Sequence, residues 1–209
     1  CQGQPLPPRQ AAQFTKSLAD ALQHAHDQGV LHRDIKPSNV LLNAFDQALL
    51  ADFGLAKVSR FDAELTRSGQ QIGTPAYMAP EQAQGRAAEV GVRTDVYGLG
   101  AVLYELLTGR AVFSAGTPLD TLHRVLTEDP VPFAQLGVKA PADLEAICLK
   151  CLEKDPNRRY ASAAELTRDL QCFLAGEPTQ ARPLTWDGRV IKWMRRRPLV
   201  AALLVTVTV

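Results

Sequence analysis

Residues 94–108 place the strongest constraint on how this chain folds. Their sequence, TDVYGLGAVLYELLT, is apolar on nearly every face of a helix, and Gly109 follows as a helix-ending residue. A helix of this kind is stable in a globular domain only when other elements cover it on all sides. We therefore predict that this helix, capped by Thr94, is the buried centre of a mainly helical domain.

Other stretches carry the signals of elements that can supply this cover. Helix signals mark segments 9–28, a segment that starts after Thr117, 141–153 and 163–174. Two short apolar runs, 40–42 and 48–51, flank a polar turn and predict a β-hairpin. The sequence thus indicates several helices around a central one, with a small sheet beside them.

The composition limits the class of protein. The chain has 209 residues, of which 46% are hydrophobic and 22% charged, as expected for one sizeable globular domain. A net charge of +1 gives no support for nucleic-acid binding. Cys148 and Cys151 lie in an apolar helical pattern without a second ligand pair, so we expect buried thiols in a reducing, cytoplasmic domain.

Three short motifs stand out for their polar chemistry. Residues 32–39 read HRDIKPSN and gather a carboxylate, cations and an amide in eight positions. Residues 52–54 read DFG and follow the predicted hairpin, which returns the chain to its start. Residues 79–81 read APE and end a long irregular segment, of a length that indicates a functional loop or a disordered one.

In this order and at these spacings, the motifs resemble the C-terminal lobe of eukaryotic-type (Hanks-type) serine/threonine protein kinases. The resemblance covers about residues 9–176. It implies an α+β protein-kinase-like fold with a mainly α-helical C-terminal lobe and a short β-hairpin, which we assign to residues 1–176. It also implies transfer of the γ-phosphate of ATP to serine and threonine hydroxyls of protein substrates in signal transduction.

The resemblance gives roles to four residues of the first two motifs. Asp34 would accept the proton of the substrate hydroxyl, and Lys36 would place its ammonium group on the transferred phosphate. Asn39 and Asp52 would supply oxygen ligands to Mg²⁺, or to Mn²⁺ in its place, because hard cations prefer oxygen ligands. The predicted hairpin would bring these two ligands together.

The resemblance also implies how the loop after the DFG motif is organised. Arg33 matches kinases in which a phosphate orders this activation loop, since an arginine fork suits a bidentate contact. Thr66 and Ser68 are the candidate phosphate carriers, and ordinary polar loop residues are the alternative for both. Thr74 would hydrogen-bond near the catalytic aspartate and lysine, as in serine/threonine kinases.

Four further polar residues are expected to support the site. By the resemblance, residues 32–39 form the catalytic loop, and His32 would pack beneath it and bond its backbone, rather than act as a base. Asp95, at the start of the central helix, would hold the same loop from below. Glu81 and Arg159 would form a buried ion pair. It would tie the activation segment, which runs from the DFG motif to the APE motif, to the helical base, which is the helical part of the lobe.

Part of a complete kinase is missing from the sequence. A glycine-rich loop, a strand lysine and a helix glutamate normally precede the catalytic loop, whereas the 31 residues before His32 read as a linker and one helix. Gly98 and Gly100 lie in the predicted buried helix and lack a third glycine at the required spacing. We expect the N-terminal lobe to be absent from this chain and this segment alone to be inactive.

The end of the chain changes character. Residues 177–197 contain a basic cluster with Trp186 and Trp193, and Pro198 is followed by eleven uncharged residues up to Val209. We predict a basic juxtamembrane segment and the truncated start, at residues 198–209, of a transmembrane helix. The alternative is a C-terminal core strand or helix.

The order of kinase lobe, basic segment and apolar segment resembles bacterial membrane-anchored receptor-like kinases. It implies a single-pass protein in the cell membrane with a cytoplasmic kinase lobe, and a homodimer is possible for trans-autophosphorylation. Two other functions compete with this interpretation: a pseudokinase scaffold that only binds, and a small-molecule phosphotransferase of related fold. The complete set of catalytic residues disfavours the first, and the GTPAYMAPE segment disfavours the second.

Overall fold

The structure is a computed structural model, and it describes residues 3–45, 47–53 and 75–182. Its α-helices are α1 (Pro8–Asp27), α3 (Pro80–Ala83), α4 (Val92–Thr108), α5 (Pro118–Thr127), α6 (Ala142–Cys151) and α7 (Ala163–Ala175). Its strands are β1 (Val40–Leu42) and β2 (Ala48–Leu50). Short 3₁₀ helices cover Pro37–Asn39, Pro75–Tyr77, Ala87–Glu89, Phe133–Leu136 and Pro156–Arg158. The described part is mainly helical with one two-stranded sheet, as the sequence predicts.

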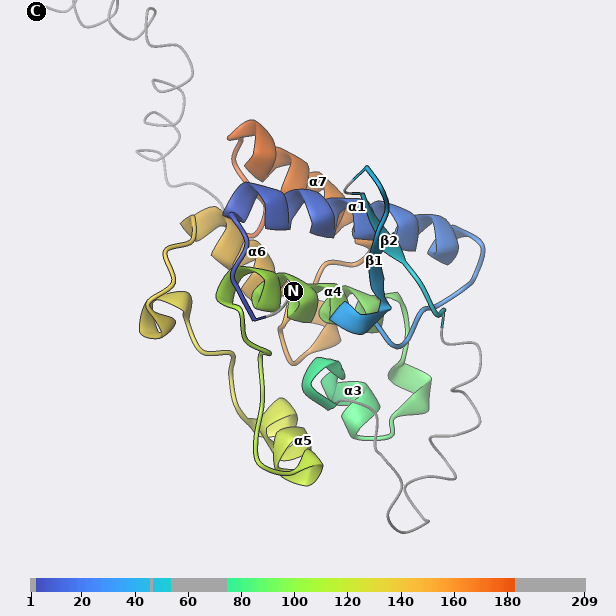
Figure 1. Cartoon of the computed structure of the whole chain (residues 1–209). Coiled ribbons are helices and arrows are strands. Elements are labelled where there is room, and N and C mark those ends of the chain that lie inside the picture. The colour runs from blue at the N-terminus through green and yellow to red at the C-terminus, as the bar shows by residue number, and fades with distance from the viewer. Residues whose placement is uncertain (1–2, 46, 54–74, 183–209) are drawn as a thin grey trace, which may run out of the picture.

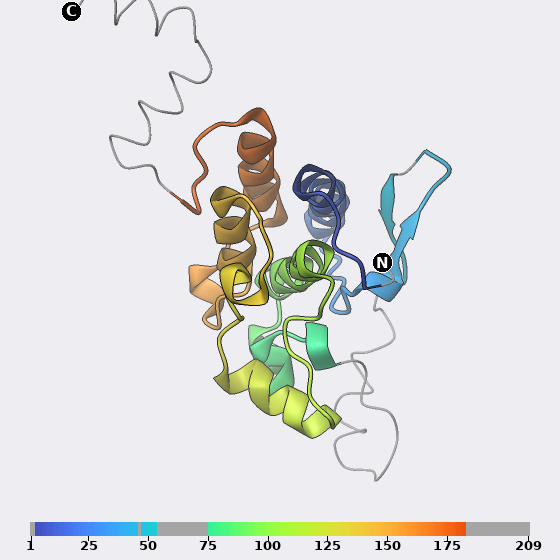
Figure 2. The same cartoon turned by 60° about the vertical axis from the view of Figure 1, so that its left-hand side comes forward.

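The helix α4 is the buried centre of the domain. Almost all of its side chains are buried, and α1, α6 and α7 pack against it. Figure 1 shows the surrounding helices from the side, and Figure 2 views α4 nearly end-on within them. The prediction that Thr94 is the N-cap is wrong, because Gly91 holds that position. The hydroxyl of Thr94 accepts a hydrogen bond from the Gly91 amide at 3.0 Å, so it caps the helix from inside the first turn.

Two glycines of α4 allow neighbouring segments to approach its backbone closely. A Cβ atom at Gly98 would lie 2.8 Å from Cβ of Ile35, and one at Gly100 would lie 2.4 Å from Cβ of Cys151. Both distances are far shorter than a normal carbon–carbon contact. These glycines therefore serve packing of the catalytic loop and α6 against α4, which agrees with the view that they are not a nucleotide-binding loop.

Substitution of Gly100 by alanine is therefore expected to destabilise the fold by about 1–3 kcal/mol through overpacking against α6. Gly116 is the matched control, because its surroundings are open and alanine there meets no atom within 4 Å. Urea unfolding of the two variants checks the prediction. Equal stability of both variants would show that α4 and α6 can separate without cost.

The first helix links the central helix to the hairpin. The apolar face of α1 is buried and packs against α4, α7 and β2. Its start at Pro8 is typical, since proline lacks an amide hydrogen that the first turn does not use. Gly29 follows with φ +74°, as predicted for a helix end. Figure 1 shows α1 and α7 side by side across one face of α4.

The β-hairpin returns the chain to the end of the catalytic loop. β1 and β2 are antiparallel, with Leu41 paired to Leu49. Beyond the last pair, the Ala51 amide donates to the Asn39 carbonyl at 2.8 Å. The side-chain oxygen of Asn43 accepts two backbone amides and closes the turn. The residues on either side of the hairpin, which include Asn39 and Asp52, are therefore neighbours.

Other local predictions agree with the structure. The Thr117 hydroxyl accepts from the Asp120 amide at 3.1 Å, and the Ser162 hydroxyl accepts from the Glu165 amide at 3.2 Å, as helix caps do. Cys148 and Cys151 are fully buried, and burial raises the pKa of both thiols. These thiols therefore stay protonated at neutral pH and belong to the core, as predicted.

The predicted membrane segment lies outside the residues that the structure describes. Within residues 3–45, 47–53 and 75–182, no helix combines the length and the apolar character that a membrane span requires. The boundaries at residues 176 and 197 remain predictions.

Candidate active site

The catalytic loop is held from below by one buried carboxylate at the start of α4. Asp95, 1% exposed, accepts the backbone amides of His32 at 2.9 Å and Arg33 at 2.7 Å. Its Oδ2 atom also lies 2.8 Å from Nε2 of His26 in α1. Asp95 thus lies where the sequence places it, and His26 is an additional partner that the sequence analysis did not identify.

His32 connects the catalytic loop to the segment after the hairpin. Its buried ring bonds the Ala51 carbonyl through Nε2 at 3.1 Å, and its Nδ1 accepts the Asp34 amide at 3.3 Å. A carbonyl can only accept, so Nε2 is the donor in its bond, while Nδ1 is the acceptor in the other. The ring of Phe53 lies 4.8 Å away, centroid to centroid. These contacts match the structural role expected of His32.

Two residues of the site have an unusual backbone conformation. Arg33 has φ +64° and Asp52 has φ +57°, and they are the only non-glycine residues with positive φ in the described ranges. This region is uncommon for residues with a side chain, and such residues cluster at functional sites. The bond from the Arg33 amide to Asp95 helps to hold this conformation.

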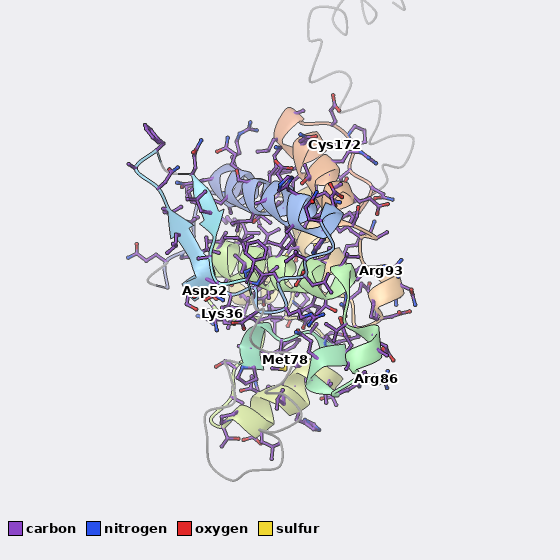
Figure 3. All side chains as sticks on the ribbon, turned by 90° about the vertical axis from the view of Figure 1, so that its right-hand side faces the viewer. Lys36, Asp52, Met78, Arg86, Arg93 and Cys172 are labelled. Atoms are coloured by element: carbon purple, nitrogen blue, oxygen red, sulfur yellow. The ribbon has the colours of Figure 1, made fainter. Side chains whose placement is uncertain are left out.

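Both predicted catalytic side chains contact each other, and one predicted metal ligand joins them. Nζ of Lys36 lies 2.9 Å from Oδ2 of Asp34, and Nδ2 of Asn39 donates to the same oxygen at 3.2 Å. Nδ2 also donates to the Asp34 backbone carbonyl at 2.8 Å. Asp52 follows Ala51, whose amide bonds the Asn39 carbonyl, so it lies at the same end of the hairpin as this group; Figure 3 labels Lys36 and Asp52. The site therefore presents two carboxylates, an ammonium group and an amide.

The oxygen atoms of Asn39 and Asp52 fit a magnesium ion. Because Nδ2 of Asn39 faces Asp34, its Oδ1 atom is directed to the other side, where among the described residues it accepts only a long 3.5 Å contact from Ser38. The carboxylate of Asp52 is exposed and makes no hydrogen bond to another described residue. Carboxylate and amide oxygens are the ligands that Mg²⁺ prefers.

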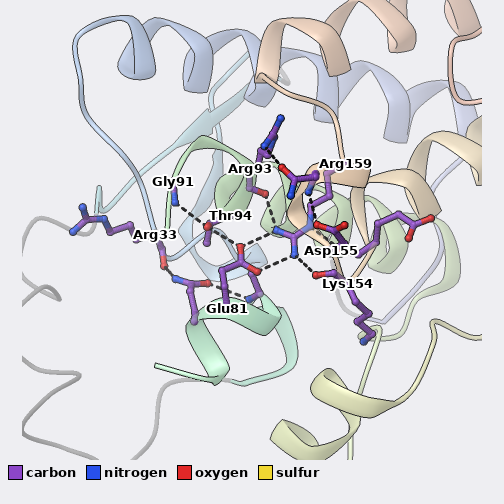
Figure 4. A network of polar contacts seen from close by, with 12 residues as sticks. Arg33, Glu81, Gly91, Arg93, Thr94, Lys154, Asp155 and Arg159 are labelled. Carbon is purple, nitrogen blue, oxygen red and sulfur yellow. Dashed lines mark hydrogen bonds and ion pairs between the residues drawn. The ribbon is translucent and has the colours of Figure 1, made fainter. Parts of the chain in front are cut away.

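A buried ion pair joins the APE motif to the helical base. Arg159 binds Glu81 through two hydrogen bonds of 2.8 Å each, and the Thr94 hydroxyl donates to Glu81 at 2.8 Å. Figure 4 shows that Arg159 also donates to backbone carbonyls, which include those of Arg93 and Lys154. Burial alone would raise the pKa of Glu81, but Arg159 outweighs it and lowers that pKa. The structure thus brings Glu81 and Arg159 together.

Two further contacts of this region were missed by the sequence analysis. The hydroxyl of Tyr77 donates to Glu105, an acidic residue in the last turn of the apolar helix α4. Burial and Glu105 together raise the pKa of Tyr77. Gln82 bonds the catalytic loop directly. The position of Glu105 within an apolar run was a usable signal, whereas nothing in the sequence pointed to Gln82.

Comparison with known proteins assigns the sequence to a family. The protein kinase domain model matches residues 2–170. The chain belongs to the protein kinase family. This confirms the predicted resemblance to eukaryotic-type serine/threonine kinases.

The kinase chain is similar to several bacterial proteins. It is 38% identical to serine/threonine-protein kinase PknB of Mycobacterium leprae over 184 residues, which is 88% of this chain and 29% of that protein. The same identity, over 185 residues, holds for PknB of Mycobacterium tuberculosis, with the same shares of both proteins. A probable serine/threonine-protein kinase of Streptomyces coelicolor is 37% identical over 180 residues, 86% of this chain and 26% of that protein. The chain thus spans under a third of the length of these relatives.

Some predicted kinase residues lie outside the described part of the chain. Thr66, Ser68 and Thr74 all fall within residues 54–74, so the structure says nothing about them. The structure shows where the other predicted residues lie, and the roles given to them stay predictions.

Proposed function

We propose that this chain is the C-terminal lobe of a bacterial serine/threonine protein kinase that transfers the γ-phosphate of ATP to protein hydroxyls. The observation that carries the proposal is the contact among Asp34, Lys36 and Asn39, with Asp52 brought alongside by the hairpin. This group offers a base, a cation and metal ligands at one place. Phosphoryl transfer requires such positioning and charge compensation more than covalent chemistry.

Each side chain of this group has a defined task in the proposed reaction. The Asp34 carboxylate accepts the proton of the substrate hydroxyl and orients its oxygen toward the phosphate. The Lys36 ammonium group, which contacts Asp34 in the structure, balances the negative charge of the phosphate oxygens. Asn39 and Asp52 hold Mg²⁺, which when bound neutralises phosphate charge.

The exposed face of the hairpin fits the base of the nucleotide. Leu41 and Leu49 face each other on the side of the sheet away from the core and are 55% and 48% exposed. They follow Asn39 and precede Asp52 along the chain, so this apolar face lies next to the proposed metal ligands. We assign it to the adenine ring and to the N-terminal lobe, which would cover it in the complete protein.

Arg33 supports the proposal that a phosphate orders the activation segment. Its Nε atom is buried and has no hydrogen-bond partner in the described part of the structure. A buried guanidinium nitrogen without a partner is costly, and a phosphate can satisfy it with a charge-assisted bond. Thr66 and Ser68 remain the proposed carriers.

Replacement of Thr66 and Ser68 by alanine in the longest natural chain that contains this segment is expected to lower the activated rate by about tenfold or more. The reason is that the loop loses the phosphate that Arg33 would bind. Steady-state kinetics before and after autophosphorylation measure the effect. Fully active wild-type enzyme in which mass spectrometry finds both hydroxyls unmodified would contradict the prediction.

The remaining features of the proposal concern the complete protein. The basic segment and residues 198–209 would anchor it in the cell membrane with the kinase lobe in the cytoplasm, and a homodimer would allow trans-autophosphorylation.

A test of acceptors separates the proposed function from its alternatives. The longest natural chain is incubated with ATP, Mg²⁺ and, in separate reactions, serine and threonine peptides, small alcohols or aminoglycosides. The proposal predicts phosphate on the peptides alone. Transfer to the small molecules would favour a small-molecule phosphotransferase, and ATP binding without any transfer would favour a pseudokinase.

A further inference from the structure

The peptide bond that precedes Asp34 is held at both of its polar atoms. Its amide hydrogen, on Asp34, is donated to Nδ1 of His32 at 3.3 Å. Its oxygen, the Arg33 carbonyl, accepts a hydrogen bond from Nε2 of Gln82 at 2.8 Å. Figure 4 shows this link from the Arg33 backbone to a side chain of α3, close to the Glu81 network.

The side chain of Gln82 can make this bond in one orientation only. Its Oε1 accepts the Ala79 amide at 3.1 Å, which turns Nε2 toward the Arg33 carbonyl. An amide is suited to this place because it accepts on one side and donates on the other. Glutamate has the same shape and keeps the first bond, but it presents an acceptor to the carbonyl.

This bond supports a strained peptide directly before the proposed catalytic aspartate. Arg33 has φ +64°, so its peptide lies in a conformation that needs external support. Asp95 of α4 accepts the amide of Arg33, whereas Gln82 of α3 donates to its carbonyl. A rotation of this peptide would turn the backbone from which the Asp34 side chain extends.

We propose that Gln82 is a positioning residue that fixes the peptide plane before Asp34 and so aligns the proposed catalytic carboxylate. This inference rests on the proposed kinase function, because it gives the alignment its purpose. It also couples the C-terminal end of the activation segment to the catalytic loop by a direct bond. A displacement of α3 would then shift the peptide before Asp34 through this bond, independently of the ion pair with Arg159.

The bond itself is tested in the 209-residue chain, without any need for activity. Gln82→Glu is expected to raise the hydrogen-exchange rate of the Asp34 amide by about tenfold, which corresponds to about one net hydrogen bond. Gln82→Met, which has neither donor nor charge, should do the same. Gln84→Glu is the control, because it adds the same charge on an exposed position two residues away. Unchanged exchange in both Gln82 variants would overturn the inference.

The effect on alignment is tested in the longest natural chain. Gln82→Glu is expected to lower kcat about tenfold or more while KM for ATP stays within about twofold, since a small misplacement of a catalytic group mainly affects the reaction step. Gln84→Glu should retain the wild-type kcat. Equal kcat for both variants would overturn the positioning role. An inactive wild-type chain would instead contradict the proposed function, and the exchange experiment would still decide whether Gln82 holds the peptide.

Discussion

Replacement of Asp34 by asparagine is expected to lower the rate of phosphate transfer by about 10²–10⁴-fold. Asparagine keeps the size of the side chain but cannot accept the proton of the substrate hydroxyl. ATP affinity should stay within a few-fold, because the proposed metal ligands are Asn39 and Asp52. Single-turnover transfer and equilibrium nucleotide binding, both with the longest natural chain, measure the two effects.

The exposed residue Asp129 provides a matched control for this substitution. It lies just beyond the end of α5 and is not one of the residues assigned to the proposed site, and Asp129→Asn makes the same chemical change. This variant should transfer phosphate at the wild-type rate. Unchanged turnover in Asp34→Asn would show that Asp34 has been given the wrong role.

The second large effect concerns stability. Replacement of Arg159 by methionine is expected to destabilise the 209-residue chain by about 3–5 kcal/mol, because Glu81 would remain as a buried carboxylate without its partner. Simultaneous replacement of Glu81 by glutamine should recover part of this loss, since it removes the unpaired charge. Urea unfolding at neutral pH measures all three free energies of unfolding.

An exposed ion pair of the same protein is the control. Arg86 and Glu89 lie 3.4 Å apart, with both side chains about half exposed. Solvent screens such pairs, so Arg86→Met should cost no more than about 1 kcal/mol. Similar losses for Arg86→Met and Arg159→Met would contradict the structural role of the buried pair.

The contribution of Glu81 should also depend on pH. Its pKa in the folded protein lies below the ordinary value of 4.5. The unfolded chain therefore takes up a proton at higher pH than the folded chain does, and the stability given by the pair falls as the pH falls below about 4.5. The difference in stability between the wild type and Glu81→Gln should shrink from pH 7 to pH 3. A constant difference would show that Glu81 has no lowered pKa.

The helices and the hairpin could be predicted because the sequence pattern of each matches the side chains that it buries. The all-round apolar pattern identified α4, glycines marked helix ends, and the alternation of short apolar runs identified the hairpin. The Thr94 cap was misassigned because threonine is favoured at the N-cap, whereas here its hydroxyl reaches back to Gly91. Which residue becomes the N-cap depends on backbone angles, and the sequence does not show these.

The site could be predicted to the level of its motifs but not of all its contacts. Asp34, Lys36, Asn39 and Asp52 were named because the order of their motifs is specific to one family. The bonds from His26 to Asp95 and from Gln82 to the catalytic loop join residues 69 and 49 positions apart. A contact of that kind depends on how the helices pack, so one sequence alone gives no signal for it.

The most direct test of the central claim is transfer of labelled phosphate from γ-labelled ATP to a serine- and threonine-containing protein by the longest natural chain, measured with Mg²⁺ and with EDTA. The account predicts phosphoserine or phosphothreonine in the presence of Mg²⁺ and neither product in EDTA. Absence of transfer under both conditions, or transfer that persists in EDTA, would contradict it.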